Sequence, residues 1–408
     1  MAQPEDLLHH FHFPNNAYVG WSGFTGVGYP KRIPTALAEH VEKNNLQGKL
    51  KYNLFVGASS GAETENRWAR NNMIERRAPH QVGKEMAKGI NNGNINFFDK
   101  HLSMFPSDLV YGFYTKHQAN NSLDVAVVEA SCITECGGII PGASVGASPE
   151  IIQMADKIII QVNTSIPSFQ GLHDITFTDL PPHRKPYLIT GPEDRIGTPH
   201  IPIDPEKVIA MVESNLPDQT TPNTPADADS KAIASHLISF LKHESAASQA
   251  VKPTSKTSKV WTEVLQDTFL DLFDSGNLDF ATATSIRFSP EGFSRFFKKT
   301  GPATTPKLLL RSQALSNSPE IIRRLGVIAM NTPVEVDIYA PREFQPSSPG
   351  PACFNGLGGS ADFSPQREIQ HHAHAFDASD LIGSHGDQLH RADCARTWIR
   401  RNMIWMSW

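Results

Sequence analysis

Short runs rich in Val and Ile, alternating with helical stretches, constrain the fold of this chain most. The clearest runs are residues 52–56, 124–130 and 157–163, and each has turn residues on either side. β-Branched residues favour strands, and strands that alternate with helices are typical of α/β folds. The first half of the sequence therefore predicts an α/β fold.

Helix starts can be placed where Ser or Asp is followed by Pro and Glu. This pattern occurs at residues 148–150, 204–206 and 318–320. It offers an oxygen that caps the first turn, a proline where an N–H would lack a partner within the helix, and a carboxylate at the positive helix end. We expect helices at these three places. Further helices are predicted at residues 231–242, 264–273 and 292–298, and strands at 326–331 and 334–339.

The length of 408 residues exceeds what one hydrophobic core usually organises. Two domains are therefore the first expectation, with one large α/β domain as the alternative. Residues 216–229 contain three prolines and several Thr and Asp, so they cannot bury an apolar face. We place the domain junction there. Residues 245–259 form a second weakly patterned segment.

Composition excludes several classes of protein. The net charge of -5 carries no basic excess, which argues against a nucleic-acid binder. No apolar run is long enough to span a bilayer, so we expect no membrane segment. Four cysteines are too few for a disulfide scaffold, and Cys132 and Cys136 lack a second pair at zinc-ligand spacing. We expect no metal site.

Several longer segments carry a family resemblance. The chain resembles the acetyl-CoA hydrolase and succinyl-CoA:acetate CoA-transferase family over residues 17–340 and in a short block near residue 360. The segments that carry the resemblance are 18–28, 53–59, 77–84, 98–104, 260–267, 321–331 and 355–363. Matches of this length are far more specific than a three-residue motif.

The resemblance implies an architecture for the whole chain. Family members are expected to have two related open-sheet CoA-transferase-like halves with the active site between them. On this basis residues 1–225 form the N-terminal α/β domain and residues 226–363 an incomplete C-terminal domain. Residues 364–408 are then an unmatched tail, which we expect to be disordered.

The resemblance also implies a reaction. A glutamate carboxylate attacks the thioester of an acyl-CoA, and the released thiolate attacks the resulting anhydride to give a glutamyl-CoA thioester. This intermediate passes CoA to a second carboxylate or loses it to water, and the sequence does not decide between them. At matching positions Glu263 is the nucleophile, and Asn355 and Gly359 contact CoA or the oxyanion. Coenzyme A is thus a substrate, and no cofactor is tightly bound.

Local physical chemistry agrees with these assignments. We expect Glu263 between a strand end and a helix that starts near Val264, where the helix N-terminus keeps the carboxylate ionised. The glycine run 356–359 offers N–H donors to a developing oxyanion. The segments at 20–24 and Gly57 are expected to shape the acyl pocket. For His80 and His101 a structural role is favoured over acid–base catalysis.

Three departures from the family pattern leave an alternative open. Residues 245–259 stand where the family has a Gly-Ile-Gly-Asn-Ile segment that contacts CoA, residues 341–346 replace a polar stretch, and no match is expected after Phe363. We hypothesise that the chain is truncated and that frame errors produced residues 341–354 and 364–408, which the nucleotide sequence would test. The histidines at 371–374 are then accidental. The alternative function is a catalytically inactive truncated relative that at most binds acyl-CoA or a protein partner.

A third hypothesis, a dinucleotide-binding oxidoreductase, is weakened because no acidic residue follows the glycines of 20–28 at the required distance.

The family also implies substrates and a place of action. The expected substrates are acetyl-CoA or succinyl-CoA together with acetate, in acetate metabolism. The expected localisation is mitochondrial or cytoplasmic, and a homodimer is the expected assembly if the chain does not act alone.

Overall fold

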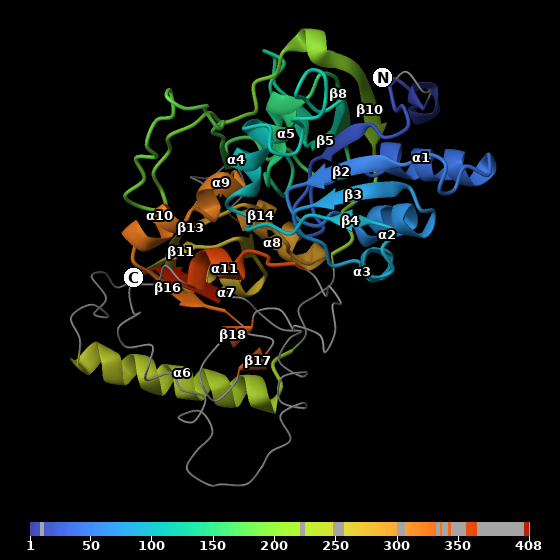
Figure 1. Ribbon diagram of the computed structural model, residues 1–408. Helices are drawn as coiled ribbons and strands as arrows, with labels where there is room; N and C mark the ends of the chain where they lie inside the picture. Colours follow the sequence, from blue (N-terminus) through green and yellow to red (C-terminus); the bar gives the residue numbers. More distant parts are fainter. Residues whose placement is uncertain are drawn as a thin grey trace.

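Two open sheets, each flanked by helices, make up the computed structural model (Figure 1). The structure describes residues 1–8, 12–220, 225–247, 257–299, 307–331, 335–336, 342–343, 356–364 and 404–407. The predicted α/β class is confirmed, because most neighbouring strands of both sheets run parallel and helices connect them.

The first sheet has seven parallel strands in the order β10-β8-β5-β1-β2-β3-β4. The chain moves outward from β1 in both directions, so the strand order reverses between β1 and β5. Its strands are β1 Tyr18–Trp21, β2 Tyr52–Val56, β3 Ile74–Ala78, β4 Asn96–Phe97, β5 Val125–Ala130, β8 Ile158–Asn163 and β10 Val208–Ser214. The helices of this half are α1 Arg32–Lys43, α2 Ala62–Arg70, α3 Lys84–Asn91, α4 Phe105–Val110 and α5 Ser148–Met154, with 3-10 turns η1 Pro4–Leu7 and η2 Pro205–Lys207 and the hairpin β6 Cys132–Ile133 and β7 Ile139–Ile140.

The second sheet has six strands in the order β16-β19-β11-β13-β15-β9. They are β9 His173–Asp174, β11 Ser258–Trp261, β13 Leu278–Ala283, β15 Leu308–Arg311, β16 Val327–Met330 and β19 Ile404–Ser407, of which β19 is antiparallel to its neighbours. The helices are α6 Ala228–Ala247, α7 Thr268–Asp274, α8 Pro290–Lys299, α9 Gln313–Ser316, α10 Pro319–Arg324 and α11 Ser360–Phe363; small pairs are β12 Val264–Leu265 with β14 Ser285–Ile286 and β17 Glu335–Val336 with β18 Arg342–Glu343.

Two strands of the second sheet come from unexpected parts of the chain. β9 belongs to the predicted N-terminal domain, and it pairs with β15 at the edge of the second sheet. β19 lies in the tail that we expected to be disordered. The other residues of that tail after Ser364 lie outside the described residues. The domain limits at residues 225 and 363 stay a prediction.

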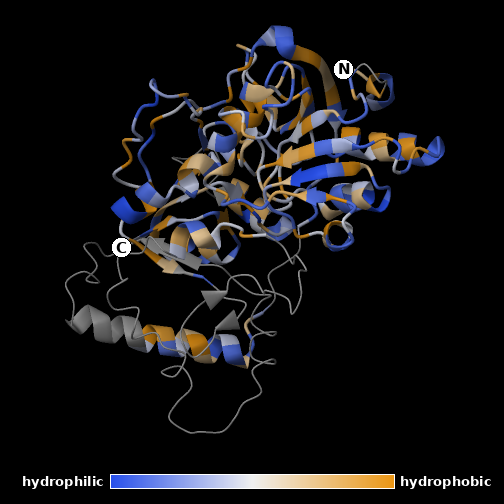
Figure 2. Cartoon of the chain, viewed as in Figure 1, coloured by the Kyte–Doolittle hydropathy of each residue, from blue (hydrophilic) through white to orange (hydrophobic). Residues whose placement is uncertain are grey.

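Burial explains why the strand runs could be recognised. Every residue of β2 and of β5 is buried, as expected for central strands of a sheet covered on both faces. Figure 2 shows hydrophobic colours along β2 and polar colours along the neighbouring β3. The predicted helix at 204–206 is instead a 3-10 turn, because β10 begins at Val208 and leaves no room for a helix.

One apolar core joins the two halves. A single buried cluster includes Val145 and Ile151 from the first half and Leu265 and Ile286 from the second. The halves therefore pack through buried side chains, and residues at their junction are shielded from water. In Figure 1, α6 stands apart from the two sheets.

Candidate active site

Glu263 lies at this junction, in the short connection between β11 and β12. Its main-chain oxygen accepts hydrogen bonds from the N–H groups of Thr284 at 3.1 Å and Ser285 at 3.2 Å. The helix predicted near Val264 starts only at Thr268, because Val264 and Leu265 pair with β14 instead. Glu263 is thus held by strand connections and not by a helix N-terminus.

The carboxylate of Glu263 is buried beside an amide. Only 5% of the residue is exposed, and Asn317 Nδ2 donates to its Oε2 at 2.6 Å. Ser316 Oγ lies 2.8 Å from Asn317 Oδ1, which fixes the amide with its NH2 group toward Glu263. This hydrogen bond fixes the orientation of the Glu263 carboxylate.

The expectation that Glu263 stays ionised through a helix dipole was wrong. Burial raises the pKa of Glu263 to about 7, the hydrogen bond from Asn317 opposes the rise, and the charge of Asp362 adds to it. At neutral pH the carboxyl group therefore exists in both protonation states. Its ionised form is poorly solvated, which favours nucleophilic attack.

The glycine loop reaches the same carboxylate. A Cβ on Gly359 would overlap the carboxylate of Glu263, so the main chain approaches it as only glycine permits. Gly356 and Gly358 have φ values of 107° and 63°, and the N–H of Leu357 donates to Asp99 at 2.8 Å. Gly359 thus adjoins Glu263, while its contact with CoA or the oxyanion stays a prediction. Asn355 lies outside the described residues.

Asp362 links the glycine loop to the first half of the molecule. Its carboxylate accepts from Ser103 Oγ at 2.6 Å and from the Ser103 N–H at 3.0 Å, and it lies 3.2 Å from His101 Nδ1. A further contact of 3.3 Å reaches Asn317 Nδ2. Asp362 raises the pKa of His101 through this hydrogen bond. Sequence reasoning missed Asp362, Asn317 and Ser103, although Asp362 belongs to the family-like block 355–363.

His80 lies under the glycine loop. Burial, reinforced by Arg77, lowers the pKa of His80 to about 4, so its ring is neutral. A Cβ on Gly356 would come within 3.2 Å of His80 Nδ1. Both histidines considered from the sequence therefore adjoin the loop, and the structural role favoured for them stays a prediction.

An apolar patch with residues from both halves lies beside Glu263. Phe24, Ala58, Leu102 and Val264 form a buried cluster. A Cβ on Gly57 would lie 2.9 Å from the oxygen of Gly23, so the two turns expected to shape the acyl pocket come together. By contrast, a Cβ on Gly20 would meet Ile151 of the core.

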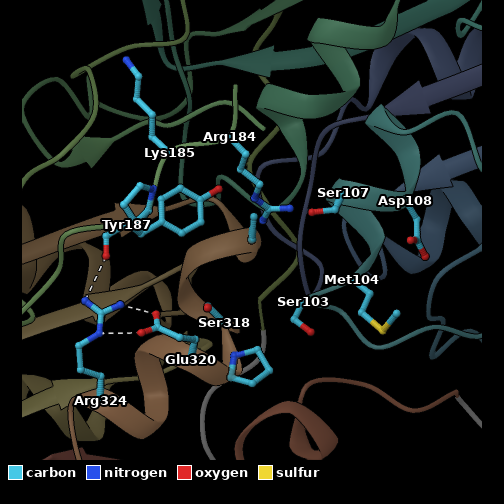
Figure 3. Close-up of a pocket in the computed structure, with 13 residues that line it drawn as sticks. Ser103, Met104, Ser107, Asp108, Arg184, Lys185, Tyr187, Ser318, Glu320 and Arg324 are labelled. Atoms are coloured by element: carbon cyan, nitrogen blue, oxygen red, sulfur yellow. Dashed lines mark hydrogen bonds and ion pairs between the residues drawn. The ribbon is translucent and has the colours of Figure 1, made fainter. Parts of the chain in front are cut away.

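An open pocket of about 480 Å³ adjoins the site (Figure 3). Ser103 and Ser318 line it, and these residues neighbour the Asp362 and Asn317 contacts. Its Asp108 pairs with Lys100, and its Glu320 with Arg324. Within the described ranges neither Arg184 nor Lys185 has a carboxylate partner, so the pocket carries an uncompensated positive charge.

In the part of the chain that the structure describes, no group of three or more His, Cys, Asp or Glu residues could hold a metal ion. Among the same residues, no helix is long and apolar enough to cross a membrane.

Comparison with protein families gave two matches. Residues 1–213 match the acetyl-CoA hydrolase/transferase N-terminal domain, and residues 292–379 match the C-terminal domain of the same name. The second match extends past Phe363, where we expected the similarity to end.

Curated relatives share most of the sequence. An acetyl-CoA hydrolase of Neurospora crassa is 65% identical, over 89% of this chain and 73% of its own length. Proteins of the same name from Schizosaccharomyces pombe and Saccharomyces cerevisiae are 58% and 55% identical, over 86% of this chain and 71% and 70% of theirs.

Solved structures share the fold at low sequence identity. RipA from Yersinia pestis superposes with a TM-score of 0.57 at 16% identity, over 84% of this chain and 73% of RipA. The putative alfa subunit of citrate lyase from Streptococcus mutans superposes at 0.57 with 11% identity, over 89% and 70%. These likenesses concern the fold alone.

Proposed function

Because this chain belongs to the acetyl-CoA hydrolase/transferase family, we propose that it acts on acetyl-CoA through the carboxylate of Glu263. The family predicted from the sequence is confirmed, and with it an acyl-CoA hydrolase enzyme. The inactive alternative is not favoured, since the named hydrolases match most of the chain.

The observation that carries the proposal is the burial of Glu263 against Gly359 at the junction of the halves. The ionised carboxylate attacks the thioester carbonyl, the C–S bond breaks, and an acetyl-glutamyl anhydride and CoA thiolate form. The thiolate attacks the glutamyl carbonyl, which releases acetate and leaves a glutamyl-CoA thioester. Water cleaves this thioester in a hydrolase, and a carboxylate does so in a transferase.

The neighbours of Glu263 have separate roles in this scheme. Asn317 orients the attacking oxygen. Gly359 lets the main chain of the glycine loop come close to the Glu263 carboxylate, where its N–H groups would donate to a developing oxyanion, and Asn355 remains a proposed contact of CoA. The positive charge near Arg184 and Lys185 would attract an anionic substrate into the open pocket.

Substrates and setting extend the proposal. Coenzyme A would enter only as part of a substrate, with no cofactor tightly bound. Acetate or succinyl-CoA would serve as the second substrate of a transferase. Action in mitochondria or cytoplasm, and assembly as a homodimer, are proposed on the family alone.

Covalent trapping tests the proposal. The protein is incubated with acetyl-CoA, treated with borohydride, digested and analysed by mass spectrometry. We expect a modified peptide that contains Glu263 and no modification in the Glu263→Gln variant. A wild-type protein that hydrolyses acetyl-CoA with this peptide unmodified would refute the assignment.

A further inference from the structure

Glu150 is a buried carboxyl group that the proposed reaction does not use. It lies in the first turn of α5 and is 0% exposed. In the described part of the chain two hydroxyl groups donate to it and no cation pairs with it: Thr178 Oγ1 lies 3.2 Å from Oε1, and Ser312 Oγ lies 3.2 Å from both carboxyl oxygens. Burial raises its pKa to about 7, which favours the protonated form. A buried carboxyl without a cation is costly and calls for a reason.

Ser312 connects this carboxyl to the second half of the molecule. It caps α9, because its Oγ accepts from the N–H of Ala314 at 3.2 Å. A serine hydroxyl has one hydrogen. When Ser312 donates that hydrogen to Glu150, the lone pairs of its Oγ are free to accept from the N–H of Ala314. The N–H of Gln313 also donates to the oxygen of Gly146 at 2.9 Å. Gln313 Nε2 donates to the oxygen of Leu102 at 2.8 Å as well. The first half thus fixes the start of α9 at three points.

The other end of α9 carries the amide that orients Glu263. The N–H of Asn317 donates to the oxygen of Gln313 at 3.1 Å, and its Nδ2 donates to Glu263 at 2.6 Å. Because α9 spans only Gln313–Ser316, a displacement of its first turn moves Asn317 with it.

We propose that Glu150 is a positioning residue, which through Ser312 and α9 holds the amide of Asn317 against Glu263. The inference rests on the proposed function, since it assigns Glu150 to the same reaction. Its role requires hydrogen bonds and no charge. Glutamine at position 150 should therefore still hold Ser312, whereas alanine should not.

The test is the single-turnover rate at which acetyl-CoA modifies Glu263, measured against pH in variants of the full chain. We expect Glu150→Ala and Ser312→Ala each to slow the reaction by about tenfold or more, with little change in the KM for acetyl-CoA. The double variant should be no slower than either single one, because both remove one interaction. Glu150→Gln should stay within about threefold of the wild type. The control Thr178→Val should stay within about twofold, since the hydrogen bond of Thr178 to Glu150 does not involve Ser312 or α9.

The pH dependence separates positioning from general loosening. Asn317 stabilises the ionised form of Glu263, while the charge of Asp362, whose carboxylate lies 3.2 Å from His101 Nδ1, destabilises it. In Glu150→Ala the acidic limb of the profile should therefore move to higher pH. Additive losses of rate in the two alanine variants would overturn the inference. A loss of rate that only matches the loss of folded protein would overturn it as well. If Glu150→Ala and Ser312→Ala are both modified at the wild-type rate, the role of Glu150 is refuted and the proposed function stands. If the wild type is not modified at Glu263, the proposed function fails, and the role of Glu150 fails with it.

Discussion

The raised pKa of Glu263 gives the reaction a testable pH dependence. Only the ionised carboxylate attacks, and burial raises the pKa of this group to about 7. We expect kcat/KM for acetyl-CoA to rise with pH through about 7 and to level off above it, since a raised carboxyl pKa depletes the active form on the acidic side. Initial rates between about pH 5 and 9 measure this. A constant rate down to pH 5 would contradict the buried environment.

The close approach of Gly359 to Glu263 leaves no space for a side chain. In Gly359→Ala the new Cβ would overlap the carboxylate, so either the loop or Glu263 must move. We expect kcat to fall by about a hundredfold, with stability lowered by roughly 1–3 kcal/mol through overpacking. Steady-state kinetics and urea unfolding measure the two effects. Ser360→Ala in the same turn is the matched control and should change kcat less than about threefold.

The sequence identified single residues only where they carry family-like patterns. Glu263 and Gly359 were selected in this way, and the structure brings them together, while their roles stay predictions. Asn317 was missed because its relation to Glu263 depends on contacts between residues 54 positions apart. The protonation of Glu263 was misjudged because burial depends on tertiary packing, which a local pattern does not describe.

α11 connects the glycine loop to the first half through Asp362. The charge of Asp362 raises the pKa of Glu263, so its removal should lower that pKa. We expect the acidic limb of the rate profile in Asp362→Asn to move to lower pH, opposite to the shift expected for Asn317→Ala. The pair of variants therefore provides its own control. A shift of both profiles in the same direction would show that these charges do not set the pKa of Glu263.

Local patterns predicted strands well where a run of apolar residues is also buried in the structure. The runs at 52–56, 124–130 and 157–163 became β2, β5 and β8 to within a residue. The helix predicted from residue 264 began later, because β12 pairs with β14, a contact that no local propensity describes. The strand predicted at 334–339 lies largely outside the described residues.

For the whole molecule, the sequence placed a domain junction at 216–229, a segment that cannot bury an apolar face. Within this segment the structure places the Asp218 side chain, 5% exposed, against the first sheet. Lys31 Nζ lies 2.9 Å from this carboxylate and 2.7 Å from that of Glu129, and the N–H of Gly28 donates to Asp218 at 3.1 Å. Composition could not reveal this buried ion pair, because Lys31 lies nearly 190 residues before Asp218 in the sequence.

This buried cation should hold the segment that leads toward the second half. Replacing Lys31 by Met leaves the carboxylates of Glu129 and Asp218 buried without a counter-charge, so we expect a loss of about 3–5 kcal/mol in the free energy of unfolding. Lys51→Met is the matched control: Lys51 pairs with Glu75 at 2.9 Å, but their side chains are 23% and 39% exposed. Such a pair contributes less than about 1 kcal/mol. Urea unfolding of both variants decides the matter, because equal losses would mean that Asp218 does not anchor the segment.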